Sequence, residues 1–341
     1  MAKVTIEDVA ELARVSIKTV SRVLNNESHV RSDTIERVRD AIRTLNYKPN
    51  PFARGLAGSR SFVVGLLYDN PSSSYVINVQ LGALRVCDVH HYDLLIHPCN
   101  SDDPGLADAL SQLVRTSKVD GFLLTPPISD SEAIVATLNA AGIPHVRVAP
   151  GDRSDPHGIV LTNDFDVSVE MTRYLASLGH RRIAFIQGQP GHLAQAERYH
   201  GFVQGMREAG LAVDARLVSQ GYNTFDSGIR CAEDLLALPD RPTAIFAAND
   251  EMAVGAMRVA RLRGLDVPGE LSVAGFDDAP IAEQIYPSLT TIRQPVRSMA
   301  SAATELLLSQ LRGNGGSMAG PVIPSSLQIR ESTGPCPARP R

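Results

Sequence analysis

The chain has 341 residues, 43% of them hydrophobic, and a formal net charge of −4. This length allows two or three domains, and no apolar run approaches the ~18 residues that predict a membrane span. The polar N-terminus predicts no secretory signal and the four scattered cysteines form no CxxC pair, so we expect a cytoplasmic protein with no membrane association, metal site or cofactor.

Two short helices are expected at the start of the chain. Thr5 followed by Asp8 matches a capping box, and apolar residues then recur at helical spacing up to Ala13. Ser16 is a suitable N-cap for a second helix, whose outward-facing residues are short-chained or basic. A third helix is expected over residues 32–45. This arrangement suits entry into the DNA major groove, which is about 12 Å wide.

The distribution of charge favours this interpretation over an ordinary three-helix bundle with a solvated face. Residues 1–60 contain 11 Lys and Arg against 7 Asp and Glu, a net charge of +4, while the rest of the chain carries −8. A basic head on an acidic body is typical of a phosphate-binding module attached to a domain that does not bind nucleic acid.

Residues 48–60 are expected to connect this head to the rest of the chain. Pro49 and Pro51 disfavour helix at the residues before them, and residues 52–57 are too few for a helix that is stable alone in water. The segment is either a flexible linker or a hinge helix that folds only with DNA and a second copy of the chain. In the second case, Leu56 could wedge between base pairs at the minor groove and bend the duplex.

From Ser61 onward, apolar strands alternate with amphipathic helices, which predicts parallel sheets covered on both faces. The pattern runs to about residue 161 and then starts again, so we expect two lobes. The fold class is therefore an N-terminal helix-turn-helix bundle followed by a two-lobed α/β body. The expected boundaries are 1–47 for the helix-turn-helix domain, 48–60 for the hinge helix or linker, about 61–162 plus 295–320 for lobe one, about 163–293 plus 321–330 for lobe two, and 331–341 for a flexible tail.

Polar residues that follow the strands are the candidate ligand-binding residues, because open α/β sheets bind ligands outside the carboxyl ends of their strands. With two lobes, this edge becomes a cleft. Asp250 and Asp278 are better explained as helix caps, and Asn249 is either a binding residue or a turn residue. The candidates are Tyr68, Asp69, Asn70, Tyr75 and Thr125 in lobe one, and Arg198, Asn249, Asp250, Asp277, Asp278 and Gln294 in lobe two and the crossover.

Two long motifs lie at a suitable mutual spacing in the head and the hinge. The first runs from Thr5-Ile6 through Val15-Ser16 to residues 19–25, and the second runs from residue 45 to Leu56. With them, the chain resembles the LacI/GalR family of bacterial transcription regulators. The resemblance extends almost to residue 330 and implies a periplasmic-binding-protein-like body.

The resemblance also implies which residues contact DNA. Ile17, Lys18 and Arg22 occupy positions that contact base edges, and Arg22 suits bidentate recognition of guanine. Gly55 departs from the larger residues often found at its position, which weakens a hinge helix. The other residues implied in DNA binding are Thr5, Ser16, Thr19, Ser21, Asn25, His29, Asn50, Ala53 and Leu56.

For the effector, the resemblance selects Arg198, Asn249, Asp277 and Gln294 from the candidates. Mixed donors and acceptors, with a tyrosine stacking on a ring face, suit a sugar or a derivative of one. The expected effector-binding residues are Tyr68, Asp69, Tyr75, Thr125, Arg198, Asn249, Asp277 and Gln294.

The sequence disfavours two other functions. An enzyme is disfavoured because the chain has no GxSxG, no P-loop and no GxGxxG after the first strand. A solute-binding protein for transport is disfavoured by the DNA-binding head and the missing export signal.

We therefore expect an allosteric repressor of carbohydrate-utilisation genes. Two heads of a homodimer bind half-sites of a double-stranded operator, and effector binding changes the angle between the lobes so that the hinges unpair. The Gly- and Pro-rich end of the chain cannot form a leucine heptad coil, which predicts a dimer rather than a tetramer.

Overall fold

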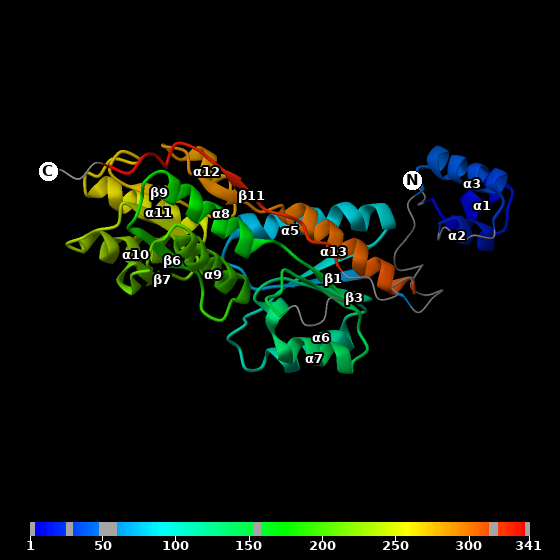
Figure 1. Cartoon of the computed structure of the whole chain (residues 1–341). Coiled ribbons are helices and arrows are strands. Elements are labelled where there is room, and N and C mark those ends of the chain that lie inside the picture. Colours follow the sequence, from blue (N-terminus) through cyan, green and yellow to red (C-terminus); the bar gives the residue numbers. More distant parts are fainter. Residues whose placement is uncertain (1–3, 25–29, 48–59, 153–157, 314–319, 338–341) are drawn as a thin grey trace. The chain divides into compact units, whose positions relative to one another are not determined.

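The computed structural model describes residues 4–24, 30–47, 60–152, 158–313 and 320–337, in two compact units, Met1–Phe62 and Val63–Arg341 (Figure 1). The predicted hinge helix, with Asn50, Ala53 and Leu56, lies outside the described residues. Asn25 and His29 of the predicted DNA contacts lie outside them as well.

The first unit holds three helices: α1 (Ile6–Ala13), α2 (Ile17–Leu24) and α3 (Ser32–Leu45). The predicted capping box is present, because Asp8 N–H donates to Thr5 Oγ1 at 3.4 Å and Thr5 N–H donates to Asp8 Oδ2 at 2.7 Å. Ser16 Oγ accepts from Thr19 N–H at 3.2 Å, as expected of a cap. The core is thin, with Val9, Val20 and Val38 fully buried, so each helix depends on the other two.

Lobe one of the second unit contains a five-stranded parallel sheet in the order β2-β1-β3-β4-β5. Helices α5 and α13 pack together on one face, and α6 and α7 cover the other (Figure 1). Its elements are β1 (Val63–Tyr68), α5 (Ser73–His90), β2 (Asp93–Pro98), α6 (Leu106–Thr116), β3 (Gly121–Leu124), η1 (Ile128–Asp130), α7 (Glu132–Ala140), β4 (His145–Val148), β5 (Ile159–Val160) and α13 (Val296–Leu311).

Lobe two contains a four-stranded parallel sheet in the order β7-β6-β8-β9. Helices α8 and α9 pack together on one face and α10 and α11 on the other, over a core in which Phe185 contacts Phe202 and Phe246. Its elements are α8 (Asp164–Ser177), β6 (Ile183–Gln187), α9 (Leu193–Glu208), η2 (Ala215–Leu217), β7 (Val218–Gln220), α10 (Phe225–Ala237), β8 (Ala244–Ala247), α11 (Asp250–Leu262), β9 (Ser272–Ala274) and α12 (Ile281–Gln284).

The chain passes between the lobes at three places. One is the segment between β5 and α8, and the second is β10 (Thr291–Arg293), which leads into α13. The third leads into β11 (Ser326–Gln328), which pairs antiparallel with β10, while Leu161 and Val322 form an isolated bridge. The three crossings therefore lie side by side. The body of two lobes, each with a parallel sheet, is as the sequence predicts.

The predicted flexible tail is wrong over residues 331–337. Ser332 is fully buried, donates to Val273 O at 2.6 Å and accepts from Thr290 N–H at 2.8 Å. His180, also fully buried, lies 3.0 Å from Gly334 O through Nε2. This end of the chain is held by hydrogen bonds rather than by apolar side chains, so its composition gave no sign of packing.

Within the described residues, no helix combines the length and the apolar character needed to cross a membrane.

Candidate functional site

A cavity of about 470 Å³, including space open to solvent, lies between the lobes of the second unit. It adjoins the carboxyl ends of the strands, where the two lobes meet at the crossing segments. Lobe one and its connections contribute Asn70, Ser72, Tyr75, Pro126, Ala149 and Thr162, and lobe two and the second crossing contribute Asp164, His192, Ala194, Gln195, Arg198, Asn223, Asn249, Asp277 and Gln294.

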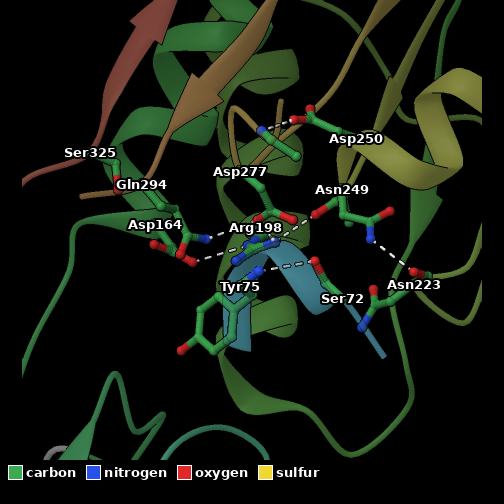
Figure 2. Close-up of polar contacts among 12 residues, drawn as sticks. Ser72, Tyr75, Asp164, Arg198, Asn223, Asn249, Asp250, Asp277, Gln294 and Ser325 are labelled. Carbon is green, nitrogen blue, oxygen red and sulfur yellow. Dashed lines mark hydrogen bonds and ion pairs between the residues drawn. The ribbon is translucent and has the colours of Figure 1, made fainter. Parts of the chain in front are cut away.

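Arg198 occupies the centre of the lobe-two wall (Figure 2). Its side chain projects from α9 and is only 5% exposed. Nε donates to Asp164 Oδ2 at 3.0 Å, Nη1 donates to Ala248 O at 2.6 Å, and Nη1 lies 3.6 Å from Asp277 Oδ1. The guanidinium also lies 3.7 Å from the centroid of the Phe276 ring. A buried cation needs this many partners to offset its desolvation.

Asp277 follows β9 with a φ of 118°, a conformation that L-residues rarely adopt. Gln294 Nε2, from the segment before α13, donates to Asp277 Oδ1 at 3.3 Å. Burial raises the pKa of Asp277 to about 7, although Arg198 opposes that rise. The carboxyl therefore changes charge near neutral pH, at a point where two crossing segments meet.

Asn249 takes the helix-capping role that the sequence suggested for Asp250, and it also lines the cavity. Asn249, not Asp250, is the N-cap of α11, because its Oδ1 accepts from Met252 N–H at 3.0 Å, and its Nδ2 donates to Asn223 O at 3.0 Å. Asp250 instead accepts from Ala279 N–H at 2.7 Å and from Thr291 Oγ1 at 2.5 Å. Asp250 thus ties the loop that carries Asp277 to α11, and Asn249 holds the loop of Asn223.

Asp278 does not cap a helix either. Its carboxylate pairs with Arg293 at 2.5 Å and with Arg330 at 2.7 Å. These pairs join the loop after β9 to Arg293 in β10 and to Arg330 just beyond β11. None of these three residues lines the cavity.

Five residues of the lobe-two wall were not predicted from the sequence: Asp164, His192, Ala194, Gln195 and Asn223. Each is at least nine-tenths buried, and His192 Nδ1, Gln195 Oε1 and Asn223 Oδ1 have no hydrogen-bond partner among the described residues. Burial lowers the pKa of His192 to about 4, helped by the charge of Arg198. Applying the strand-end rule to β6 and β7 as well would have nominated this region.

His192 lies close to lobe one. Burial lowers its pKa so that the ring is neutral at pH 7, and the Pro126 backbone of lobe one opposes this shift. A neutral imidazole has one N–H and one lone pair, and Nδ1 has no hydrogen-bond partner among the described residues. Nδ1 is therefore the ring atom that a ligand in the cavity can contact, as acceptor or donor according to the tautomer.

A second contact between the lobes lies beside this one. A Cβ at Gly151 would overlap the Leu193 side chain at the start of α9. Asp130 in η1 accepts from Gly151 N–H at 2.8 Å, and burial raises its pKa while backbone hydrogen bonds, including one from Leu193, lower it. The start of α9 is thus held against lobe one.

Of the predicted effector-binding residues, the structure brings Tyr75, Arg198, Asn249, Asp277 and Gln294 together. Burial raises the pKa of the Tyr75 phenol, whose helix begins at the Ser72 N-cap. The other three predicted residues, Tyr68, Asp69 and Thr125, do not line the cavity.

Local hydrogen bonds account for two of these three differences. Asp69 Oδ2 accepts from Ser101 N–H at 2.8 Å and from Ser101 Oγ at 2.6 Å, and so braces a neighbouring loop. Thr125 is fully buried, and its Oγ1 donates to Leu67 O at 3.3 Å within the sheet. The position of a residue after a strand does not determine which way its side chain points.

In the first unit, the outer face of α2 matches the predicted DNA-reading face. Val20 and Val23 point into the core, whereas Ser16, Ile17 and Lys18 are exposed and Arg22 is partly exposed. Thr5 is exposed, and Thr19 and Ser21 are partly exposed. Ile17 is 46% exposed on this face, and Leu12 of the same bundle is 49% exposed.

Known protein families match both structural units of the chain. Residues 5–50 match the model of bacterial regulatory proteins of the lacI family, and residues 172–333 match a periplasmic binding protein-like domain. The transcriptional regulator DegA of Bacillus subtilis is 34% identical over 338 residues, which cover 98% of this chain and 99% of DegA. The chain belongs to the lacI family of bacterial regulatory proteins.

Solved structures of family members resemble the whole chain. A complex of the transcriptional regulator CelR with cellobiose has a TM-score of 0.75 at 30% identity and covers 97% of this chain and 100% of CelR. The lac repressor dimer bound to operator and the anti-inducer ONPF has a TM-score of 0.76 at 28% identity, with coverage of 98% and 100%. The protein is accordingly a DNA-binding transcription regulator with an effector domain, and the family is not enzymatic.

Proposed function

We propose that this lacI-family regulator is a cytoplasmic repressor of carbohydrate-utilisation genes, controlled by a small sugar-like effector in the cavity between its lobes. The observation that carries this is the composition of the cavity, where a buried arginine, two carboxylates, amides and a tyrosine converge. Such mixed donors and acceptors beside an aromatic ring suit a polyhydroxylated ring. The cellobiose complex of CelR, a relative of similar fold, supports a sugar as the ligand class.

In the proposed complex with DNA, α2 lies in the major groove of each half-site. Ile17 contacts a thymine methyl group, and Lys18 and Arg22 contact base edges. Thr5, Ser16, Thr19 and Ser21 lie near phosphates. Asn25, His29, Asn50, Ala53 and Leu56 complete the interface by family resemblance, although they lie outside the described residues.

The proposed dimer uses an apolar stripe on α5. Ile77, Leu81 and Leu84 are 38–53% exposed and recur at helical spacing on this helix of lobe one. Exposed apolar residues gathered on one helix face mark a protein interface more often than an accident of folding. In this dimer the α5 stripes of the two protomers would pack against each other. Because each stripe belongs to lobe one, a rotation of lobe one would change the distance between the hinge segments of the two protomers.

Effector binding acts in this account through its different affinities for two arrangements of the lobes. His192, at the start of α9, lines the cavity beside the Pro126 backbone of lobe one, so an effector in the cavity would change the contact between the lobes. Lobe one then shifts at the dimer interface, and the heads leave the operator.

The test begins with DNA selected from a random pool by the full chain. Fluorescence anisotropy on the selected duplex is then measured with members of a sugar library that raise the melting temperature. Release of the duplex by a neutral sugar at micromolar to millimolar concentration is the expected result. A purine or amino acid that releases the duplex while all sugars fail would replace the proposed effector class.

A further inference from the structure

We infer that the cavity selects an effector that has no anionic group and rejects sugar phosphates and sugar acids. Hydroxyl or amino hydrogens of the selected effector would bind to the hydrogen-bond acceptors of the lobe-two wall. The inference deepens the proposed function and rests on it. It follows from the charge balance and the hydrogen-bonding capacity of the lobe-two wall.

The charge balance of the cavity is negative. Among the lining residues that the structure describes, Arg198 is the sole cation, whereas Asp164 and Asp277 are both acidic. Two carboxylates against one guanidinium leave a net charge of −1 when Asp277 is ionised. An anionic group placed here would add a further like charge in a region where burial strengthens repulsion.

Arg198 is also poorly placed to hold an anion. Nε and Nη1 are engaged by Asp164 and by Ala248 O, at 3.0 and 2.6 Å, and the ring of Phe276 covers the guanidinium at 3.7 Å. Asp164 is itself fixed, since its Oδ1 accepts from Thr162 Oγ1 at 2.9 Å. Bidentate capture of a phosphate or carboxylate would require this buried pair to separate.

The unpaired hydrogen-bond acceptors of the lobe-two wall indicate which groups the ligand carries. Gln195 Oε1 and Asn223 Oδ1 are acceptors buried without a partner in the described part of the chain, and each orphaned acceptor carries a desolvation cost. Gln195 Oε1 and Asn223 Oδ1 both occupy the space that a Cβ at Gly188 would fill, so they converge on one point. Hydroxyl or amino hydrogens of a ligand would satisfy these atoms, whereas an ionised carboxylate or the dianion of a phosphate monoester carries no donor on its charged group.

The first experiment uses inorganic phosphate as the probe, so it does not depend on knowing the effector. Isothermal titration is performed on the full chain at pH 8 and fixed ionic strength, with wild type, Arg198→Gln and the double variant Asp164→Asn/Asp277→Asn. Wild type is expected not to bind phosphate in the cavity. Any phosphate binding that wild type shows should therefore persist in Arg198→Gln. The double variant, which leaves Arg198 without carboxylate partners, is expected to gain millimolar phosphate binding.

Two results would overturn the inference. One is phosphate binding to wild type that is lost in Arg198→Gln or, should that variant not fold, in Gly188→Leu, whose side chain displaces those of the cavity residues Gln195 and Asn223. The other is a folded double variant that gains no phosphate binding. Binding that both cavity variants retain belongs to a site elsewhere, such as the basic head, and agrees with the inference.

The second experiment compares matched sugars by thermal shift: glucose and galactose, each with its amino sugar, its 6-phosphate and its uronic acid. A neutral or amino member is expected to stabilise the chain more than its anionic partners. A phosphate or uronate that stabilises more than its neutral parent would contradict the inference. If no sugar stabilises the chain, the proposed sugar class fails, while the phosphate titration still decides the exclusion of anions.

Discussion

The two walls of the cavity differ in chemistry. Lobe two contributes a charged, hydrogen-bonded network centred on Arg198, whose members hold each other in place. Lobe one contributes short or apolar residues and the single aromatic ring of Tyr75. The difference suggests that lobe two recognises the effector and that lobe one closes over it. Four predictions test this division, from the largest expected effect to the smallest.

Removing Arg198 should cost the most. In Arg198→Leu, Asp164 and Asp277 lose their buried cation, and the free energy of unfolding should fall by about 3–5 kcal/mol, as when one partner of a buried pair is removed. Urea denaturation measures this. Arg216→Leu is the matched control, because the Arg216–Asp214 pair is exposed and should matter little. Equal losses in the two variants would mean that the Arg198 network does not hold the wall together.

Adding one methyl group at Gly188 should weaken effector binding. In Gly188→Ala, the new Cβ displaces the Gln195 and Asn223 carboxamides, which are flexible enough to move without unfolding the chain. A lost hydrogen bond of ~1.4 kcal/mol corresponds to about a tenfold weaker affinity. Titration with the effector found by the screen checks this, with Gly105→Ala, outside the cavity, as the control. Unchanged affinity in Gly188→Ala would remove the two carboxamides from the binding wall.

The charge of Asp277 should make stability depend on pH. Its pKa in the folded chain, about 7, lies above the 3.8 of an unperturbed carboxyl, so the folded state binds the extra proton and loses stability as pH rises from about 4 to 7. Asp277→Asn should therefore raise the melting temperature at pH 8 by about 2–4 °C, and less at pH 5. An equal change at both pH values would indicate that Asp277 does not change its charge between pH 5 and pH 8.

The lobe-one wall should tolerate change best. Tyr75→Phe keeps the ring and removes only the phenolic oxygen, so effector affinity should fall by about threefold or less. Titration of wild type and Tyr75→Phe under the same conditions measures the difference. A loss larger than that of Gly188→Ala would place recognition on lobe one and reverse the proposed division.

Much of the fold could be predicted from the sequence, because local signals and tertiary structure agree over most of the chain. The Thr5–Asp8 capping box and the alternating strands and helices of the body are confirmed. Resemblance to the family placed Arg198 and Asp277 in one site, and the structure brings them within 3.6 Å of each other.

Three features escaped the sequence for physical reasons. His192 and Asn223 lie on loops, whose paths depend on contacts such as the Pro126 backbone and Asn249. Asp164 begins a helix just after a crossing between lobes, so no strand end marks it. The packing of Ser332 rests on hydrogen bonds that have no hydrophobic signature.

The central claim is that the lobe-two wall controls DNA binding from a distance. Asp277→Ala tests it most directly, because the residue lies in the effector cavity and in a different unit from the DNA-binding helices. Anisotropy on the selected duplex should show operator affinity within about twofold of wild type and no release by the effector, which reduces wild-type binding at least tenfold. Release by the effector at wild-type concentrations would contradict the account.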